Sequence, residues 1–338
     1  MKMKYFLLMF VLGVCSCQKE GSQTDARPEE VDVYVAGWEG NVAKYWKNGL
    51  PVVLTDGTKP AGAESITIVG SDVYAAGSEY NGSVWVAKYW KNGQATVLTD
   101  GIKDTYARSI AVAGNNVYVA GEEHNGSANT AKYWKNGQAI ALTDGTKDAW
   151  ALSIAVMGSD VFVAGAEYNG SIYVAKYWKN GQAIALASGN RSNGANSIAI
   201  VGTDVYVGGD EYTGGSVFIA KYWKNGQAIA LSDGTMDAST VSIAVVGNDV
   251  YAAGHEKNGS GNYVAKYWKN GQAVALTDGT KEAYAISIAV VGSDVYVAGY
   301  ENNGSVDVAK YWKNGIPVIL SDASIYSSQA YSVFLAKK

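Results

Sequence analysis

Seven glutamates recur at one position of this 338-residue sequence, each two residues after a glycine. They are Glu39, Glu79, Glu123, Glu167, Glu211, Glu256 and Glu301. A carboxylate beside an aromatic residue, as at Glu79 and Tyr80, suits a sugar or a cation, and seven copies would make seven equivalent sites. The same carboxylate could instead close its loop by accepting backbone N–H groups or by pairing with a lysine, and we favour this structural role.

Acidic residues also occur in pairs around a glycine, in the segment TDGTKDA at residues 143–149 and in three related segments at 100–104, 233–237 and 278–282. Two carboxylates four residues apart could supply oxygen ligands to Ca²⁺. The spacing lacks the further ligands of a complete calcium loop, and Asp-Gly is itself a common turn. We therefore expect no cofactor and no metal, with Ca²⁺ as the alternative.

A third set of residues differs from one repeat to the next. The position just before each expected first strand holds a different residue in every repeat, namely Glu64, Arg108, Leu152, Asn196, Val241, Ile286 and Tyr331. Two residues before three of these positions lie Tyr106, Trp150 and Tyr284. Mixed polar and aromatic side chains around one opening are typical of a pocket for a single ligand. The prediction is a pocket of Glu64, Tyr106, Arg108, Trp150, Asn196, Tyr284 and Tyr331; the alternative is drift at unneeded positions.

The sequence gives little support for catalysis. The only two histidines, His124 and His255, occupy positions that hold other residues in the sister repeats, and the chain has no nucleophile motif, phosphate loop or His/Cys metal spacing. The net charge of −4 is mild and dispersed, without a basic cluster, which argues against nucleic acid as a partner. We expect a protein that is not an enzyme, and keep a hydrolase or lyase as an alternative.

All of these residues are positioned by one repeat. The stretch VAKYWKNG occurs seven times with little change, and its tryptophans follow one another at intervals of 44 or 45 residues. They are Trp46, Trp90, Trp134, Trp178, Trp223, Trp268 and Trp312. A sustained period of this length is typical of a solenoid or a propeller. With 40 glycines and only 4 prolines, the composition indicates short strands joined by tight turns.

Each repeat reads as four antiparallel strands. In the last full repeat they are expected at residues 287–291, 294–299, 308–313 and 316–320. A Gly-Ser turn joins the first two and an Asn-Gly turn the last two, and both are two-residue hairpin signals. The Asn-Gly register places Trp90 opposite Ala95, so a large ring covers a small neighbour. We expect these tryptophans to form the core, and the recurring mid-strand lysines to stack on them.

The chain ends predict a closed ring. The body starts at Val31 without a first strand, and the serine that opens each first strand reappears near the C-terminus as Ser332. Residues 330–337 would then supply the innermost strand of the first sheet. The predicted fold is all-β, a seven-bladed β-propeller of four-stranded antiparallel blades. The Gly-Ser and Asn-Gly turns define a tight-turn face; the longer loops define the opposite long-loop face, where we expect a protein or a glycan to bind.

The sequence SIAVVGSDVYVAG, followed by a glycine-containing loop and DVAKYWKNG, resembles the bacterial β-propeller repeats called SBBP. The resemblance covers residues 31–337, seven times over. It implies the same propeller fold in a secreted or surface protein, and it implies no particular activity.

The N-terminal residues differ from the repeats. Lys2 and Lys4 precede an apolar run at 5–14, as in a secretory signal, and the following VCSC at 14–17 resembles a bacterial lipobox with Cys17 as the lipid-carrying residue. We expect a signal peptide at 1–16, a flexible tether at 17–30 and the propeller at 31–338.

Together these observations predict a protein of the bacterial cell envelope, at the outer membrane and either periplasmic or surface-exposed. It would contact the membrane only through its lipid. The expected function is a non-catalytic binding or scaffold module. A multivalent lectin with one site per blade and a hydrolase or lyase at the channel mouth are the alternatives.

Overall fold

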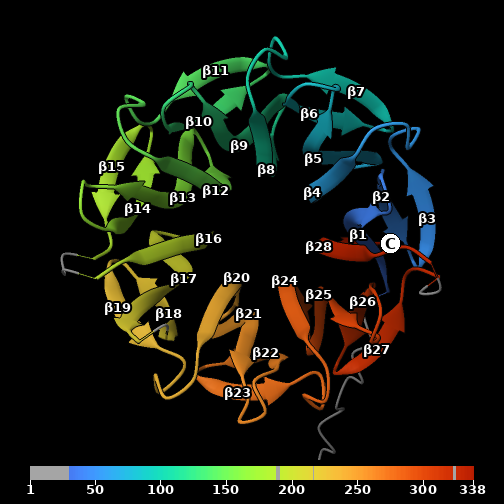
Figure 1. Ribbon diagram of the computed structural model, residues 1–338, viewed down its shortest axis with the longest axis vertical. Helices are drawn as coiled ribbons and strands as arrows, with labels where there is room; N and C mark the ends of the chain where they lie inside the picture. The colour runs from blue at the N-terminus through green and yellow to red at the C-terminus, as the bar shows by residue number, and fades with distance from the viewer. Residues whose placement is uncertain (1–29, 188–190, 216, 323–324) are drawn as a thin grey trace, which may run out of the picture.

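The computed structural model describes residues 30–187, 191–215, 217–322 and 325–338. The expected signal peptide, Cys17 and the tether as far as residue 29 lie outside the described residues. The described chain forms 28 strands in seven four-stranded sheets around a central axis (Figure 1). Within it, no helix has the length and apolar character needed to cross a membrane. The chain is a seven-bladed β-propeller, as predicted.

The two inner strands of each blade are long. The innermost strands are β28 (Ser328–Lys337), β4 (Ala61–Val69), β8 (Thr105–Ala113), β12 (Ala149–Met157), β16 (Asn193–Val201), β20 (Ala238–Val246) and β24 (Ala283–Val291). The second strands are β1 (Val31–Glu39), β5 (Asp72–Tyr80), β9 (Asn116–His124), β13 (Asp160–Tyr168), β17 (Asp204–Gly214), β21 (Asp249–Lys257) and β25 (Asp294–Asn302).

The two outer strands are shorter. The third strands are β2 (Val42–Lys47), β6 (Trp85–Lys91), β10 (Asn129–Lys135), β14 (Tyr173–Lys179), β18 (Val217–Lys224), β22 (Tyr263–Lys269) and β26 (Asp307–Lys313). The outermost strands are β3 (Leu50–Val53), β7 (Gln94–Val97), β11 (Gln138–Ala141), β15 (Gln182–Ala185), β19 (Gln227–Ala230), β23 (Gln272–Ala275) and β27 (Ile316–Ile319).

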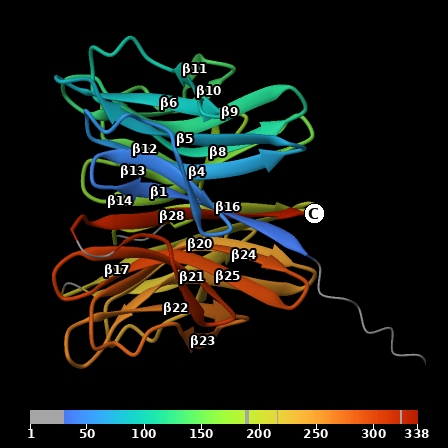
Figure 2. The same ribbon diagram turned by 90° about the vertical axis from the view of Figure 1, so that its right-hand side faces the viewer.

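The C-terminal strand closes the ring. β28 pairs with β1 in a sheet of order β28-β1-β2-β3, as predicted, and begins two residues earlier than expected. The pairing runs from Val31 opposite Lys337 to Glu39 opposite Ser328. The start of β1 and the end of β28 therefore lie together on the tight-turn face (Figure 2).

The tight turns have the predicted geometry. All seven Asn-Gly turns have positive φ at both residues, with φ of 50–52° at the asparagine, which is the pattern of a type I′ turn. The asparagine side chain adds two bonds: in one blade Asn180 accepts the N–H of Val161 at 2.9 Å and donates to Asp160 at 2.9 Å. These bonds recur from blade to blade and make the tight-turn face nearly uniform.

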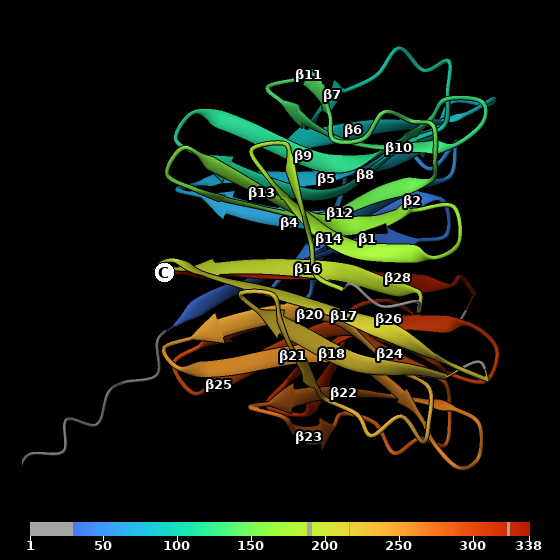
Figure 3. The ribbon, with the colours of Figure 1, turned by 90° about the vertical axis from the view of Figure 1, so that its left-hand side faces the viewer.

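The seven repeat tryptophans form the core between blades, as predicted, and each is 1% exposed. Trp178 of β14 lies opposite Ala183 of β15 and packs against Tyr118 and Ala131 of the preceding blade. An indole over an alanine fills the space between two twisted sheets, which stand one behind the other around the ring (Figure 3).

A ring of hydrogen bonds links the innermost strands. The serine of each strand accepts the N–H of a residue in the next blade, at 3.0–3.3 Å, and the pairs are Ser65–Ile110, Ser109–Ile154, Ser153–Ile198, Ser197–Ile243, Ser242–Ile288, Ser287–Val333 and Ser332–Ile66. Ser332 completes the ring, so the residue that indicated closure in the sequence also performs it.

We expect Ser153→Ala to lower the free energy of unfolding by about 1–2 kcal/mol, because the N–H of Ile198 loses its acceptor in a partly buried site. Urea unfolding measures the effect. Ser71→Ala, at an exposed tight turn, is the control and should leave the stability unchanged. Equal stability of both variants would show that the serine ring contributes nothing.

Candidate functional site

A β-bulge in every innermost strand positions the variable residues. In β8 the register passes from Ala107, opposite Gly121, to Ser109, opposite Ala120, and leaves Arg108 unpaired. The same shift leaves out Glu64, Leu152, Asn196, Val241, Ile286 and Tyr331 in the other blades. The prediction that these residues precede the first strands is wrong, because each strand starts earlier and the bulge interrupts its alternation.

The bulge requires the glycine that recurs in each second strand. A Cβ on Gly121 would lie 1.9 Å from the carbonyl oxygen of Tyr106, so no side chain fits between the two strands. The same clash, at 1.8–2.0 Å, would occur at Gly37, Gly77, Gly165, Gly209, Gly254 and Gly299. The recurring glycine thus allows one residue per blade to leave the sheet and face the channel.

The seven bulge residues meet on the axis. They line one pocket of about 260 Å³, here called the axial pocket, formed by Glu64, Arg108, Leu152, Asn196, Val241, Ile286 and Tyr331. Three blades contribute the apolar residues Leu152, Val241 and Ile286, and the other four contribute residues with polar groups. The lining is therefore amphipathic and has no sevenfold symmetry.

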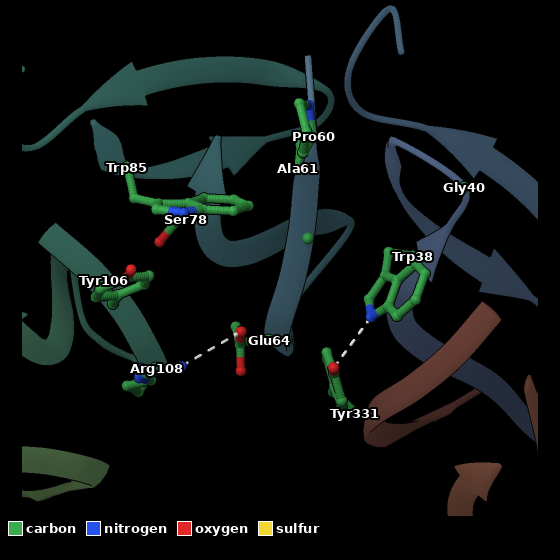
Figure 4. A pocket seen from close by; sticks show the side chains of 11 residues that line it. Trp38, Gly40, Pro60, Ala61, Glu64, Ser78, Trp85, Tyr106, Arg108 and Tyr331 are labelled. Atoms are coloured by element: carbon green, nitrogen blue, oxygen red, sulfur yellow. Dashed lines mark hydrogen bonds and ion pairs between the residues drawn. The ribbon is translucent and has the colours of Figure 1, made fainter. Parts of the chain in front are cut away.

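A second pocket of about 340 Å³ opens in the wall of the channel between the first blades of the chain (Figure 4). This wall pocket is lined by Trp38, Gly40, Pro60, Ala61, Gly62, Glu64, Ser78, Trp85, Tyr106, Arg108 and Tyr331. It shares Glu64, Arg108 and Tyr331 with the axial pocket, so the two pockets adjoin.

Arg108 lies between two carboxylates. Its Nε and Nη2 donate to Oε1 of Glu122 at 3.0 and 2.6 Å, and its Nη1 lies 3.6 Å from Oε1 of Glu64. The guanidinium also covers the ring of Tyr106, 4.8 Å from its centroid. Burial raises the pKa of Glu122, whose side chain is 2% exposed, against the opposing effect of Arg108. Burial likewise raises the pKa of Glu64.

We expect Arg108→Met to cost about 3–5 kcal/mol at neutral pH, because it leaves the Glu122 carboxylate buried without its partner. Burial raises the pKa of Glu122 in the folded protein. The Glu122 carboxyl therefore contributes most to the free energy of unfolding below the ordinary pKa of glutamate, and this contribution is lost as the pH rises through the pKa of the folded state. The variant should therefore be closer to wild type at pH 4 than at pH 7.5 in urea unfolding.

The double variant Arg108→Met, Glu122→Gln serves as the control for that experiment. Removing the charge of Glu122 should restore most of the stability at pH 7.5. A loss that is the same at both pH values, and that the second substitution does not repair, would contradict the role of the buried carboxylate.

A chain of hydrogen bonds fixes the indole of Trp38. Its ring N–H donates to the hydroxyl of Tyr331 at 3.0 Å, and that hydroxyl donates to Oε1 of Gln329 at 2.6 Å. The amide of Gln329 in turn donates to Asp307 at 2.8 Å. Three of these residues come from the C-terminal part of the chain, so closure of the ring also builds one wall of the pocket.

The other predicted pocket residues are more dispersed. Asn196 lies in the axial pocket and donates to Asp210 at 3.2 Å and to the carbonyl of Thr240 at 2.9 Å. Trp150 packs on Tyr173, with ring centroids 4.8 Å apart, and Tyr284 belongs to an aromatic cluster with His255, Tyr263 and Tyr300. Trp150 and Tyr284 lie outside the residues that line the axial and wall pockets.

Sequence reasoning missed one set of residues. The position between the recurring glycine and glutamate differs in every blade and holds Trp38, Ser78, Glu122, Ala166, Asp210, His255 and Tyr300. Trp38 and Ser78 line the wall pocket and Glu122 binds Arg108. The signal was the one that marked the bulge residues, a position that varies inside an almost constant repeat.

The repeated glutamates are paired with the repeat lysines. The ion pairs are Glu39–Lys44, Glu79–Lys88, Glu123–Lys132, Glu167–Lys176, Glu211–Lys221, Glu256–Lys266 and Glu301–Lys310. The lysines also approach the core tryptophans, as Lys176 does at 6.0 Å from the Trp178 ring. Three pairs border outer pockets of about 370–460 Å³ on the long-loop face. This pairing is the structural role that we favoured from the sequence.

The acidic residues of the crossover loops accept hydrogen bonds from protein groups, some in their own loop and some in a neighbouring strand. Oδ1 of Asp144 accepts the N–H of Thr146 at 2.9 Å and its hydroxyl at 2.7 Å, and these bonds lower the pKa of Asp144. Asp148 accepts the N–H of Asn129 at 2.8 Å. In the described part of the chain, no group of three or more His, Cys, Asp or Glu residues is arranged to hold a metal ion.

Comparisons with known proteins show the fold. One similar solved structure is titled as a Mycobacterium tuberculosis puromycin-hydrolyzing peptidase; it is 11% identical, with a TM-score of 0.50 over 76% of this chain. The chain spans 46% of that peptidase, less than half its length. At this identity the likeness shows a shared propeller architecture alone. No family model matches the sequence, and no curated protein is significantly similar to it.

Proposed function

We propose that this protein is a non-catalytic ligand-binding module with one principal site, at the long-loop end of its channel. The observation that carries the proposal is where the blades differ. The core and the tight turns are nearly the same in all blades, whereas the bulge position and the position after the recurring glycine hold different residues. The bulge residues line the axial pocket, and Trp38 and Ser78 line the wall pocket. A rigid scaffold with one asymmetric, partly aromatic pocket suits a single ligand.

We also propose that the module belongs to the bacterial envelope, held by a lipid on Cys17 and resembling SBBP-type surface repeats. The support is the sequence of residues 1–30 and the character of the repeat. In this proposal the membrane is contacted only through the lipid, and a protein or a glycan on the long-loop face is the partner.

The proposal is tested by probing arrays of glycans and of peptides with the detergent-solubilised full chain. We expect bound ligands to be lost in the double variant Trp38→Ala, Trp85→Ala, and retained in Glu167→Gln, which alters one repeated ion pair far from the wall pocket. The reverse pattern would overturn the single-site proposal in favour of a lectin with one site per blade.

One observation favours a second function, a hydrolase or lyase acting at the channel mouth. A carboxyl and a guanidinium that no other blade repeats, those of Glu64 and Arg108, converge with Glu122 beside the wall pocket, and burial raises the pKa of both carboxyls. Under this alternative Glu64 would be the acid that faces the ligand. Glu64→Gln would then bind the ligand but no longer convert it, and a wild-type protein that leaves its ligand unchanged would exclude the alternative.

A further inference from the structure

The wall pocket presents aromatic surface from three directions. Trp38 of β1 and Trp85 of β6 lie on opposite sides of Glu64, and Tyr106 and Tyr331 complete the lining (Figure 4). All four rings are partly exposed. The sequence contains ten tryptophans, seven of them in the repeat core, and two of the remaining three line this pocket. Its walls therefore favour a ligand that has an apolar face.

The charges of the pocket favour a neutral ligand. Arg108 is already bound to Glu122 and lies 3.6 Å from Glu64, so an anion would meet a cation whose charge two carboxylates compensate. An ammonium ligand would meet the guanidinium of Arg108, which already covers the face of Tyr106. An anion therefore finds no uncompensated positive charge there, and a cation would have to share Glu64 with Arg108.

The polar groups that remain suit hydroxyl groups. Glu64 faces the pocket with a side chain that is 31% exposed, and its carboxylate accepts hydrogen bonds. The buried hydroxyl of Ser78 accepts the N–H of Ala107 at 3.2 Å, which leaves its hydrogen available to donate. An acceptor and a donor beside aromatic faces match a ring with hydroxyls on its edge and carbon–hydrogen bonds on its face.

We propose that the wall pocket binds one neutral pyranose residue of a glycan, with its apolar face against Trp85 and its hydroxyls on Glu64. This inference rests on the proposed function and names its ligand class. The pocket volume of about 340 Å³ is at the small end of the range for ligand sites, and suits one sugar ring. The adjoining axial pocket, half apolar, gives room for the neighbouring part of the same ligand.

The test uses the full chain labelled with fluorotryptophan and followed by fluorine NMR. The probes are neutral methyl pyranosides and neutral tetrasaccharides, with the matching uronic acid and amino sugar as charged counterparts. We expect the neutral sugars to shift the signals of Trp38 and Trp85 and to leave the seven core tryptophans unchanged. The charged counterparts of a sugar that binds should bind less tightly.

Three variants locate the site. Trp85→Ala and Glu64→Gln should each raise the dissociation constant of a bound neutral sugar by about tenfold, the effect of losing one central contact. Trp150→Ala, which removes the third non-repeat tryptophan from outside the pocket, should leave the constant unchanged. Thermal unfolding of each variant establishes that the fold is kept.

The possible failures are distinguishable. Neutral sugars that shift neither Trp38 nor Trp85, or that bind equally well to Trp85→Ala, overturn the sugar assignment. Peptides that bind and are lost in the double variant Trp38→Ala, Trp85→Ala also overturn it, but leave the proposed single-site function standing. Tighter binding of the uronic acid or of the amino sugar overturns the argument from charge.

Discussion

Deletion of residues 328–338, which comprise β28 and the last lysine, is expected to abolish the native fold. The first sheet would lose its innermost strand, and Val33, Val35 and Trp46 would lose the cover of Ala330 and Val333. The deletion also opens the serine ring at Ser332 and removes Tyr331 from the wall pocket. Circular dichroism should show the loss of a cooperative thermal transition, and limited proteolysis should cut the truncated chain throughout.

A circular permutant is the matched control for this deletion. Lys338 donates its N–H to the carbonyl of Glu30 at 3.1 Å, so a short linker can join the strands β28 and β1. New ends opened in the exposed loop at Gly259 keep all seven sheets intact. We expect the permutant to melt as one cooperative unit. A truncated chain that melts like the full protein would show that the ring does not depend on its last strand.

Gly121→Ala is expected to lose roughly 3 kcal/mol or more of stability and to remove ligand binding. The new Cβ would lie 1.9 Å from the carbonyl oxygen of Tyr106, which is backbone and cannot turn away. Relief of the clash requires the bulge to move, and Arg108 and Tyr106 would then leave the wall pocket together. Urea unfolding measures the stability, and sugar titration measures the binding.

Substitutions at two further glycines separate the loss of stability from the loss of ligand binding. Gly165→Ala meets the carbonyl of Trp150 at 1.8 Å and should destabilise the fold equally, but its bulge residue is Leu152, outside the wall pocket. Binding by its folded fraction should therefore persist. Gly259→Ala has no neighbour within 4 Å and should be neutral in both measurements. A Gly121→Ala protein with wild-type stability would contradict the requirement for glycine at the bulge.

The architecture was predictable because three independent local signals agreed. The tryptophan period set the number of units, the Asn-Gly turn set the register of Trp90 opposite Ala95, and Ser332 marked the closing strand. Each signal comes from a few neighbouring residues, and the near-identical repeats show those residues again in blade after blade. Strand ends were less predictable, because residues expected in the crossover loops, such as Ala283, pair with the neighbouring strand.

The site was predictable only in part, because the bulge leaves a weak trace in sequence. Glu64, Arg108 and Tyr331 stood out by their variation, but the expected strand began after them. Trp38 and Glu122 escaped notice because each sits between a recurring glycine and a recurring glutamate, whose regularity suggested one uniform loop. Side chains that form hydrogen bonds across strands, such as Trp38 and Tyr331, are brought together by ring closure and not by proximity in the chain.

The described chain begins and ends on the face of the disc opposite the wall pocket. Val31 and Lys337 pair at one end of the first sheet, and Trp38 and Gln329 pair near the other, beside the wall pocket. In the proposed lipid-anchored protein, the tether from Cys17 would therefore reach the disc on the side opposite the wall pocket. The wall pocket would then face away from the bilayer. The protein could bind a long polymer in the surroundings while that polymer stays at a distance from the lipid surface.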